Sequence, residues 1–303
     1  MIPKFPEFKI LELSDKEDVE KFTSKYPPYS DFNFAGTWSW DVRDQMKISQ
    51  LNDNYVVRFI NYLTGEPFYT FLGENEVNDT AKKLLDLSIK ENLKPELRLI
   101  GEESVKLIDT STFKITEDRD NFDYVYSLEE LKNYKGRKFQ TKRYETKKFL
   151  DRYPNTEIKI INLADEKEQE NIIALYQKWV TDKKKKEKDF DSQHELIVLK
   201  KLLAAHEGFN LISIGIFIGN KLVGFCINEL RESEYVVSHV AKIDYSFSDV
   251  NSFLMQKNAE FLCSYDNKYL NYEQDLGLGT LRYSKESFRP IRFFKKFTCS
   301  YRL

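Results

Sequence analysis

The sequence is poor in cysteine, glycine and proline. Its 303 residues include three cysteines, 11 glycines and 8 prolines. The low glycine and proline contents exclude collagen-like proteins and disordered low-complexity chains. Cys226, Cys263 and Cys299 lie far apart and form no C-x-x-C pair. This pattern excludes a disulfide framework and a thiolate zinc site, and it indicates a reduced intracellular protein.

Long apolar segments are also absent. The first residues contain no apolar stretch of the kind found in signal peptides. The longest largely apolar run, residues 211–219, is shorter than the roughly 20 residues that a membrane-spanning helix needs. The sequence therefore predicts a cytoplasmic protein without stable membrane insertion.

Several common catalytic and cofactor-binding signatures are missing. The sequence has no Walker loop, G-x-S-x-G elbow, H-E-x-x-H pair or Rossmann fingerprint. His194 and His206 have no carboxylate partner at ligand spacing. We therefore expect no metal site and no tightly bound cofactor.

Aromatic and charged side chains are plentiful. Aromatic residues make up 15% of the chain and charged residues 32%, which indicates a globular protein, and the length favours two domains. The formal net charge is −2, from 47 basic and 49 acidic residues. Residues 132–152 alone hold nine basic and two acidic side chains, so this segment carries +7 and the rest of the chain −9.

Hydrophobic periodicity and turn signals predict the same order of elements twice. The first half reads as three strands, a helix, a strand, a short helix and two strands, at 46–51, 55–62, 67–72, 78–92, 97–100, 102–108, 113–116 and 123–126. In the second half, a strand at 157–161 and helices at 165–181 and 192–207 precede three strands, a helix, a strand, a short helix and a strand, at 211–218, 222–229, 235–243, 250–266, 269–274, 281–288 and 293–302.

An antiparallel meander followed by a crossover helix and another strand is the order of a GNAT-type N-acyltransferase sheet. We therefore predict an α/β (α+β) fold with two tandem GNAT-like domains, each a mixed, mostly antiparallel sheet flanked by helices. The predicted domains are residues 1–131 and 132–303, and the second begins with a basic interdomain helix at 132–153.

The basic helix is a candidate anion site. Phe139, Phe149, Leu150 and Tyr153 fall on one helical stripe, together with Thr146 and an arginine, Arg143. An arginine on an apolar stripe needs a partner, because an unpaired buried charge is costly. That partner is either a phosphate, a carboxylate or an RNA backbone, or an interdomain acid beside a solvated basic face. The residues that we expect to bind the donor's anionic groups are Lys138, Lys142, Arg143 and Arg282.

A polar cluster ends the predicted strand 269–274. Alternation along a strand would place Asn271, Glu273 and Asp275 on one face. Two neighbouring carboxylates should raise the pKa of at least one of them, which suits a general base. Lys285 falls on the inward stripe of the next helix, where it could neutralise the carboxylates or stabilise an oxyanion. The alternative is a structural carboxylate–lysine network.

His239 lies between Val237 and Ala241 on one face of a predicted central strand, which favours a hydrogen-bonded core residue. With Asn271 and Lys242 it is a possible cleft residue. The string Q-x-x-G-x-G at Gln274–Gly279 matches acetyl-CoA pyrophosphate loops. In a GNAT sheet that loop follows the fourth strand, whereas here the string follows the fifth predicted strand of the second half, so we interpret its glycines as turn residues. The turn after the fourth strand, residues 244–249, has two acids and no glycine, which disfavours ordinary CoA binding.

Three stretches together resemble the phosphatidylglycerol lysyltransferase C-terminal domain family, which is related to the peptidoglycan-bridge aminoacyltransferases. They are RDNFDYVY at Arg119–Tyr126, the segment Leu131–Phe149 with G-R-K-F and K-R, and NYEQDLG at Asn271–Gly277 with the following L-R, S-K and S-F-R-P. The resemblance implies two GNAT-like domains joined through the basic helix. In the membrane lysyltransferases this part uses lysyl-tRNA as donor. The chain departs from the family pattern at Tyr144, where relatives have Asn, and at Ala241, where they carry the Glu of His-x-Glu-Lys.

These features support two hypotheses. The first is an acyl- or aminoacyl-transferase that moves an acyl group from aminoacyl-tRNA or acyl-CoA to an amine or hydroxyl on a small-molecule or peptide acceptor. Glu273 or Asp275 would accept the proton and Lys285 would stabilise charge. The second is a non-catalytic GNAT-like module that binds an anionic ligand or a partner protein, which the missing family glutamate favours.

Overall fold

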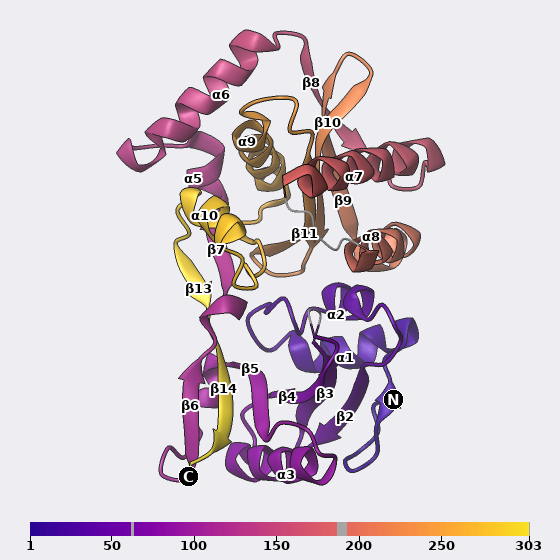
Figure 1. Cartoon of the computed structure of the whole chain (residues 1–303), viewed down its shortest axis with the longest axis vertical. Helices are drawn as coiled ribbons and strands as arrows, with labels where there is room; N and C mark the ends of the chain where they lie inside the picture. Colours follow the sequence, from indigo (N-terminus) through magenta and orange to yellow (C-terminus); the bar gives the residue numbers. More distant parts are fainter. Residues whose placement is uncertain (62–63, 187–192, 303) are drawn as a thin grey trace. The chain divides into compact units, whose positions relative to one another are not determined.

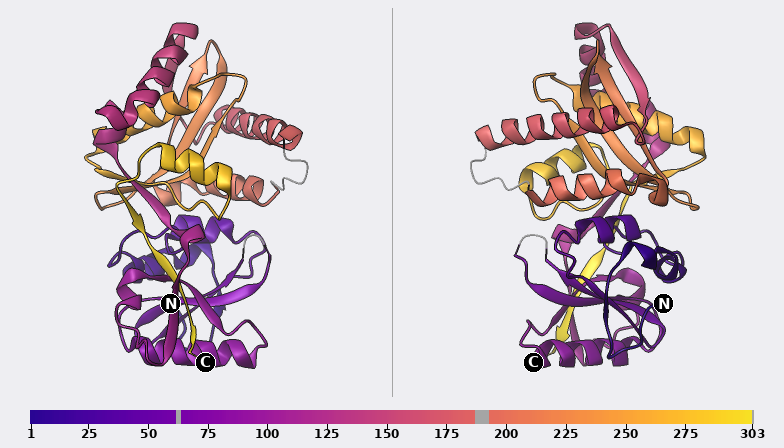
Figure 2. Two further views of the ribbon diagram at one scale, coloured as in Figure 1. Left: turned by 60° about the vertical axis from the view of Figure 1, so that its left-hand side comes forward. Right: turned by 90° about the vertical axis from the view of Figure 1, so that its right-hand side faces the viewer.

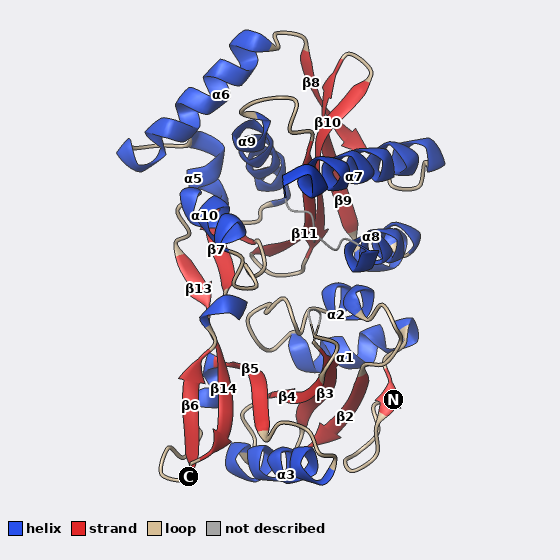
Figure 3. Cartoon of the chain, in the orientation of Figure 1, coloured by secondary structure: helices blue, strands red, loops and turns tan. Residues whose placement is uncertain are grey.

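A computed structural model describes residues 1–61, 64–186 and 193–302. Its strands form two seven-stranded sheets (Figures 1 and 3). The first sheet has the order β1-β2-β3-β4-β5-β14-β6. Its strands are β1 (Lys9–Ile10), β2 (Lys47–Leu51), β3 (Asn54–Ile60), β4 (Pro67–Leu72), β5 (Glu96–Gly101), β14 (Lys296–Tyr301) and β6 (Phe113–Glu117).

The second sheet has the order β13-β7-β12-β11-β10-β9-β8. Its strands are β13 (Arg292–Phe294), β7 (Asp123–Ser127), β12 (Tyr269–Asn271), β11 (Tyr235–Ile243), β10 (Lys221–Leu230), β9 (Leu211–Ile218) and β8 (Thr156–Ile161). In both sheets an antiparallel meander is followed by one parallel pair, β4 with β5 and β11 with β12. The predicted fold class, two mixed and mostly antiparallel GNAT-like sheets, is confirmed.

Ten α-helices are described alongside the two sheets. They are α1 (Lys16–Thr23), α2 (Phe34–Trp40), α3 (Val77–Lys90), α4 (Glu102–Val105), α5 (Leu128–Asn133), α6 (Gln140–Arg152), α7 (Glu166–Lys186), α8 (Gln193–Ala204), α9 (Val250–Leu262) and α10 (Gly279–Ser287). The predicted helices at 78–92, 102–108, 165–181, 192–207, 250–266 and 281–288 agree with α3, α4, α7, α8, α9 and α10 to within a few residues. The predicted basic helix at 132–153 contains α6 but also runs over the end of α5, which is a separate helix. Tyr62, at the end of a predicted strand, and Ser192, at the start of a predicted helix, lie outside the described residues.

The two halves of the chain exchange a strand. β7, from the first half, pairs with β12 in the second sheet, and β14, at the C-terminal end, pairs with β5 and β6 in the first sheet. The two compact units are therefore discontinuous: one comprises Met1–Asp123, Gln274–Gly279 and Phe293–Leu303, and the other Tyr124–Glu273 and Thr280–Arg292. These units differ from the predicted division after residue 131, because strand pairing joins segments that are distant in sequence.

A buried lysine helps to hold β14 in the first unit. Lys296 is fully buried and its ammonium donates hydrogen bonds to Asp31, Asp123 (2.7 Å), Ser30 (3.0 Å) and Gln274 (3.1 Å). Such a cation stays buried only when its charge is compensated. Four separate segments of the chain therefore meet at this one ammonium group.

Helices cover both faces of the second sheet. Cys226 of β10 packs in a core cluster with Phe253 and Leu254 of α9. The neighbouring Phe225 is opposite Lys242 of β11, whose ammonium lies 4.1 Å from the ring centroid of Trp179 in α7. Because successive strand residues point to opposite faces, α7 covers the face opposite α9. Figure 2 shows these helices around the strands from two further sides.

Candidate functional site

The parallel strands β11 and β12 of the second unit separate after a short ladder. They pair only from Tyr235 with Tyr269 to Val237 with Asn271. β12 ends at Asn271, whereas β11 continues to Ile243. Beyond Val237, β11 therefore has no pairing with β12, and a ligand could approach the β11 edge at this opening.

A β-bulge places His239 at this opening. Ile227 of β10 pairs with Val240, and the next residue, Asn228, pairs with Ser238. His239 is therefore the extra residue of the bulge, a device that re-aims a side chain next to many active sites. The predicted alternation with Val237 and Ala241 is wrong for this reason, because a bulge shifts the period by one residue.

The His239 imidazole bridges two carboxylates. Its Nε2 lies 2.9 Å from Oε2 of Glu229, and its Nδ1 lies 3.0 Å from Oε1 of Glu273. Arg231 donates from Nη1 to the other oxygen of Glu229 at 3.1 Å. The result is a continuous chain, Arg231–Glu229–His239–Glu273, that reaches from β10 across β11 to the segment after β12.

The two carboxylates keep the imidazole protonated. Burial alone would lower the pKa of His239, but its hydrogen bonds to Glu229 and Glu273 outweigh burial and raise the pKa to about 9. Arg231 and the imidazolium carry two positive charges and the two glutamates two negative charges, so the net charge of these four side chains is zero. Glu273 remains accessible, with 18% of its side chain exposed, whereas His239 is 2% exposed. Its Oε2 has no hydrogen-bond partner among the described residues.

The predicted alternation of Asn271, Glu273 and Asp275 is also wrong. Glu273 has a left-handed backbone, with φ 55°, and its N–H donates to Oδ1 of Asn271 at 2.8 Å. The strand has therefore ended, and the period of two no longer applies. Asp275 belongs to the first unit, where its buried carboxylate accepts from Arg119 at 3.1 Å. Glu273 and Asp275 belong to different units, and they are therefore not interchangeable as bases.

Lys285 is buried as predicted, on the inward face of α10. Its ammonium donates to the backbone carbonyl of Tyr272, the residue before Glu273, and lies 4.9 Å from the Tyr272 ring centroid. The hydroxyl of Tyr126 donates to the Lys285 carbonyl at 2.9 Å. Lys285 thus holds the segment after β12 in place, and any role at an oxyanion stays a prediction.

Lys242 lies on the sheet face that α7 and α8 cover. Its ammonium pairs with Glu195 of α8 at 2.6 Å and stacks over Trp179. Glu229 shares this face. It lies two positions along β10 from Ile227, and Ile227 is opposite Val240 of β11. Residue type and spacing in the sequence do not point to Glu229, Arg231 or Glu195. The bulge could not be foreseen from residue spacing, so no signal linked Glu229 to His239.

The predicted donor-binding cations lie on α6, α10 and the segment before α6. Lys138 pairs with Glu130 at 2.6 Å, and Lys142 pairs with Glu145 at 3.2 Å and lies 4.3 Å from the Phe288 ring centroid. Arg282 is half-buried on α10. The Lys142–Phe288 contact brings α6 and α10 together within the second unit. Their binding role stays a prediction.

Arg143 is exposed, and not buried on an apolar stripe as predicted. Its guanidinium Nη1 donates to the carbonyls of Tyr134 and Gly136, just past the end of α5. Leu150 is also exposed, at 40%. The stripe prediction is wrong at these two positions because the buried face of α6 is narrower than predicted: only Thr146 and Phe149 of the helix are buried.

The turn from β11 to α9 is acidic, and its two carboxylates form ion pairs with lysines. Asp244 is fully buried and accepts from Lys221 at 2.7 Å, with Lys178 3.1 Å away. Asp249 precedes α9 with φ 69° and lies 3.5 Å from Lys148. In the later glycine string, Gly277 is a turn residue as predicted: it has φ 74°, and a Cβ there would meet Asp120 at 2.9 Å. Gly279 is instead the first residue of α10, so the prediction is wrong for that glycine.

Within the part of the chain that the structure describes, no three His, Cys, Asp or Glu side chains are grouped so that they could hold a metal ion. None of the helices in that part combines the length and the apolar composition needed to cross a membrane.

The family whose description is "Phosphatidylglycerol lysyltransferase, C-terminal" matches residues 24–300. No protein in a search of curated sequences matches. Among solved structures, a conserved protein of unknown function from Bacteroides thetaiotaomicron has a TM-score of 0.84 and 24% identity, with all of both chains covered.

Two further structures share the fold. The C-terminal domain of a putative lysylphosphatidylglycerol synthetase from Agrobacterium fabrum has a TM-score of 0.64 and 10% identity, covering 95% of this chain and 92% of that one. L-PGS from Bacillus licheniformis has a TM-score of 0.61 and 11% identity, covering 99% and 93%. At these identities the likeness concerns the fold.

Proposed function

Because the chain belongs to the phosphatidylglycerol lysyltransferase C-terminal family, we propose that it transfers an aminoacyl group from an aminoacyl-tRNA to an amine or hydroxyl acceptor. Family and fold indicate a GNAT-like acyl- or aminoacyl-transferase in general and do not favour a non-catalytic module. The observation that carries the finer proposal is the contact of Glu273 with His239 where β11 and β12 separate.

The proposed reaction uses Glu273 as the base. The acceptor's nitrogen or oxygen attacks the ester carbonyl carbon of the donor, and its proton passes to Oε2 of Glu273. The bond from that carbon to the ribose oxygen of the tRNA then breaks, and the proton passes from Glu273 to this leaving oxygen. The His239 imidazolium holds Glu273 in one orientation, and Glu229 with Arg231 holds His239.

The acidic turn before α9 supports a tRNA ester over acyl-CoA as the donor. Phosphates bind well at helix N-termini that offer free N–H groups and no acid. Here Asp249 immediately precedes α9 and Asp244 is buried nearby. Exposed basic side chains on α6, at Lys147 and Lys148, would instead contact an RNA backbone, and such binding weakens steeply with salt.

Paired amide substitutions test the base. Glu273→Gln should slow the release of amino acids from total charged tRNA to a mixture of amine and hydroxyl acceptors by about 100-fold or more. Asp275→Asn is the matched control, because that carboxylate is engaged by Arg119, and its rate should stay within about threefold of the parent once folding is confirmed by circular dichroism. An unchanged rate for Glu273→Gln would remove Glu273 from the mechanism.

A further inference from the structure

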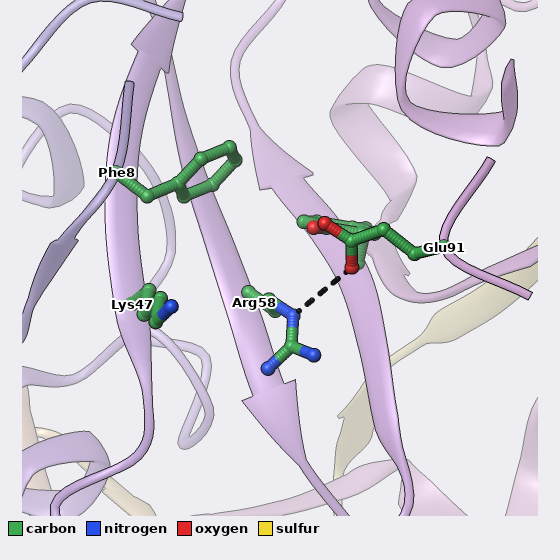
Figure 4. A pocket seen from close by; sticks show the side chains of 5 residues that line it. Phe8, Lys47, Arg58 and Glu91 are labelled. Carbon is green, nitrogen blue, oxygen red and sulfur yellow. Dashed lines mark hydrogen bonds and ion pairs between the residues drawn. The ribbon is translucent and has the colours of Figure 1, made fainter. Parts of the chain in front are cut away.

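The first unit contains a pocket far in sequence from the β11–β12 opening. It has a volume of about 350 Å³ and is lined by Phe8, Lys47, Arg58, Tyr69 and Glu91 (Figure 4). Ligand pockets for small molecules begin at roughly this size. The lining comes from the segment before β1, from β2, β3 and β4, and from the residue after α3, so five parts of one unit converge on it.

Strand register places two cations directly opposite each other in this pocket. Lys47 of β2 pairs with Arg58 of β3, and Arg58 pairs with Tyr69 of β4. Like charges directly opposite on neighbouring strands destabilise a sheet. Glu91 offsets one charge, with its carboxylate 3.4 Å from Nε of Arg58. Lys47 is exposed and has no ion pair or hydrogen bond with any side chain that the structure describes. The pocket therefore keeps one uncompensated positive charge.

Two aromatic rings form the apolar side of the pocket. The Phe8 and Tyr69 ring centroids lie 5.7 Å apart, with the planes tilted by 53°. Tyr69 is buried, whereas Phe8 is only partly buried. Figure 4 shows the Phe8 ring above the level of Lys47 and Arg58, with Glu91 across from it. A planar group stacked on Phe8 would leave an attached anion within reach of both cations.

We propose that this pocket binds a small aromatic carboxylate. A single negative charge matches the net charge of the lining, and the guanidinium of Arg58 is suited to a carboxylate. A ring on the same molecule would cover the exposed part of Phe8. This site is separate from the transfer chemistry. All five lining residues belong to the first unit, whereas His239 and the side chains hydrogen-bonded to it belong to the second.

Titration of the full-length protein with phenylacetate, followed by ¹⁵N NMR shifts of β2 and β3 amides, tests the proposal. Acetate lacks the ring, benzyl alcohol lacks the charge, and inorganic phosphate lacks both the ring and the single charge. We expect phenylacetate to bind at least fivefold more tightly than any of the three. Equal binding of acetate or phosphate, or no shift with phenylacetate at 20 mM (about 2 kcal/mol of affinity by RT ln Kd), would overturn the proposal.

Opposite charge changes give a second, independent readout. Lys47→Gln should weaken phenylacetate binding at least fivefold, whereas Glu91→Gln should strengthen it at least twofold by releasing Arg58. Lys114→Gln is the matched control, because Lys114 is an exposed lysine on β6 at the other edge of the same sheet. If Lys47→Gln and Lys114→Gln have the same effect, or if Glu91→Gln weakens binding, the pocket is not an anion site.

Discussion

His239 couples the candidate site to pH. Its pKa in the folded protein is raised from 6.5 to about 9, although burial works in the opposite direction, because Glu229 and Glu273 hydrogen-bond to the imidazolium. A raised pKa means that the folded state binds the proton more tightly than the unfolded state does. The resulting stabilisation is complete below pH 6.5 and is lost as the pH rises through about 9.

We predict that this proton linkage is visible in chemical denaturation. Between pH 6 and pH 9.5, the parent protein should lose roughly 3 kcal/mol of unfolding free energy that His239→Gln does not lose. The comparison uses the change in unfolding free energy between the two pH values within each protein. Any pH-independent cost of the substitution cancels in that change. Identical pH dependence in both proteins would mean that the imidazole is not held between two carboxylates.

Arg143 is the clearest residue whose role differs from the prediction. Its guanidinium donates to carbonyls at Tyr134 and Gly136 instead of facing an anion. Tyr134 ends α5 with a left-handed backbone, φ 44°. The carbonyls past a helix end lack intrahelical donors, and a basic side chain satisfies them well. The structure therefore assigns Arg143 to the joint between α5 and α6.

At the scale of this helix joint, Arg143→Gln should lower the free energy of unfolding by about 1 kcal/mol, as expected for losing hydrogen bonds from a charged, exposed donor. Lys147→Gln, an exposed neighbour on α6, should change stability by less than about 0.5 kcal/mol. Urea denaturation of the two variants measures both. A stability loss that is equal in both variants contradicts the capping role.

The bulge in β11 is the element that creates the candidate site. Ser238 is opposite Asn228, which contacts Asn258 of α9, and Val240 is opposite Ile227, so His239 is left without a cross-strand partner between them. At this unpaired position the imidazole contacts Glu229 and Glu273. Residue types alone therefore identified a histidine of interest, but the local register decided its partners.

At the scale of the whole molecule, the exchange of β7 and β14 makes each unit depend on the distant end of the chain. Lys296 of β14 is buried against Asp31 and Asp123, with no water-exposed side-chain area. Lys295, next to it, is only half-buried and pairs with Glu117. Adjacent lysines in the same strand region thus offer a matched test of the exchange.

Lys296→Met should lower the free energy of unfolding of the first unit by about 3–5 kcal/mol, because two carboxylates would stay buried without their cation. Lys295→Met should cost less than about 1 kcal/mol, as for other surface ion pairs. Hydrogen exchange should show faster exchange in β5 and β6, which flank β14, and not in β12. Loss of protection in β12 alone would contradict the strand assignment.

The sequence by itself determined the type and order of nearly every element, because hydrophobic period and turn residues are local signals. It also indicated the family, through the three stretches at residues 119–126, 131–149 and 271–290. The predicted strands 113–116 and 123–126 were both expected in the first domain. Only the tertiary structure decided that they join different sheets.

The candidate site shows the same division. Residue type and spacing in the sequence point to Glu273, His239 and Lys285, but not to Glu229 and Arg231, which the structure places beside His239. Asp275 was grouped with Glu273, but the strand ends before both acids and the chain then enters the other unit. Hydrogen-bond partners between distant segments, bulges and sheet membership depend on pairing energies across the whole chain, and local periodicity carries no record of them.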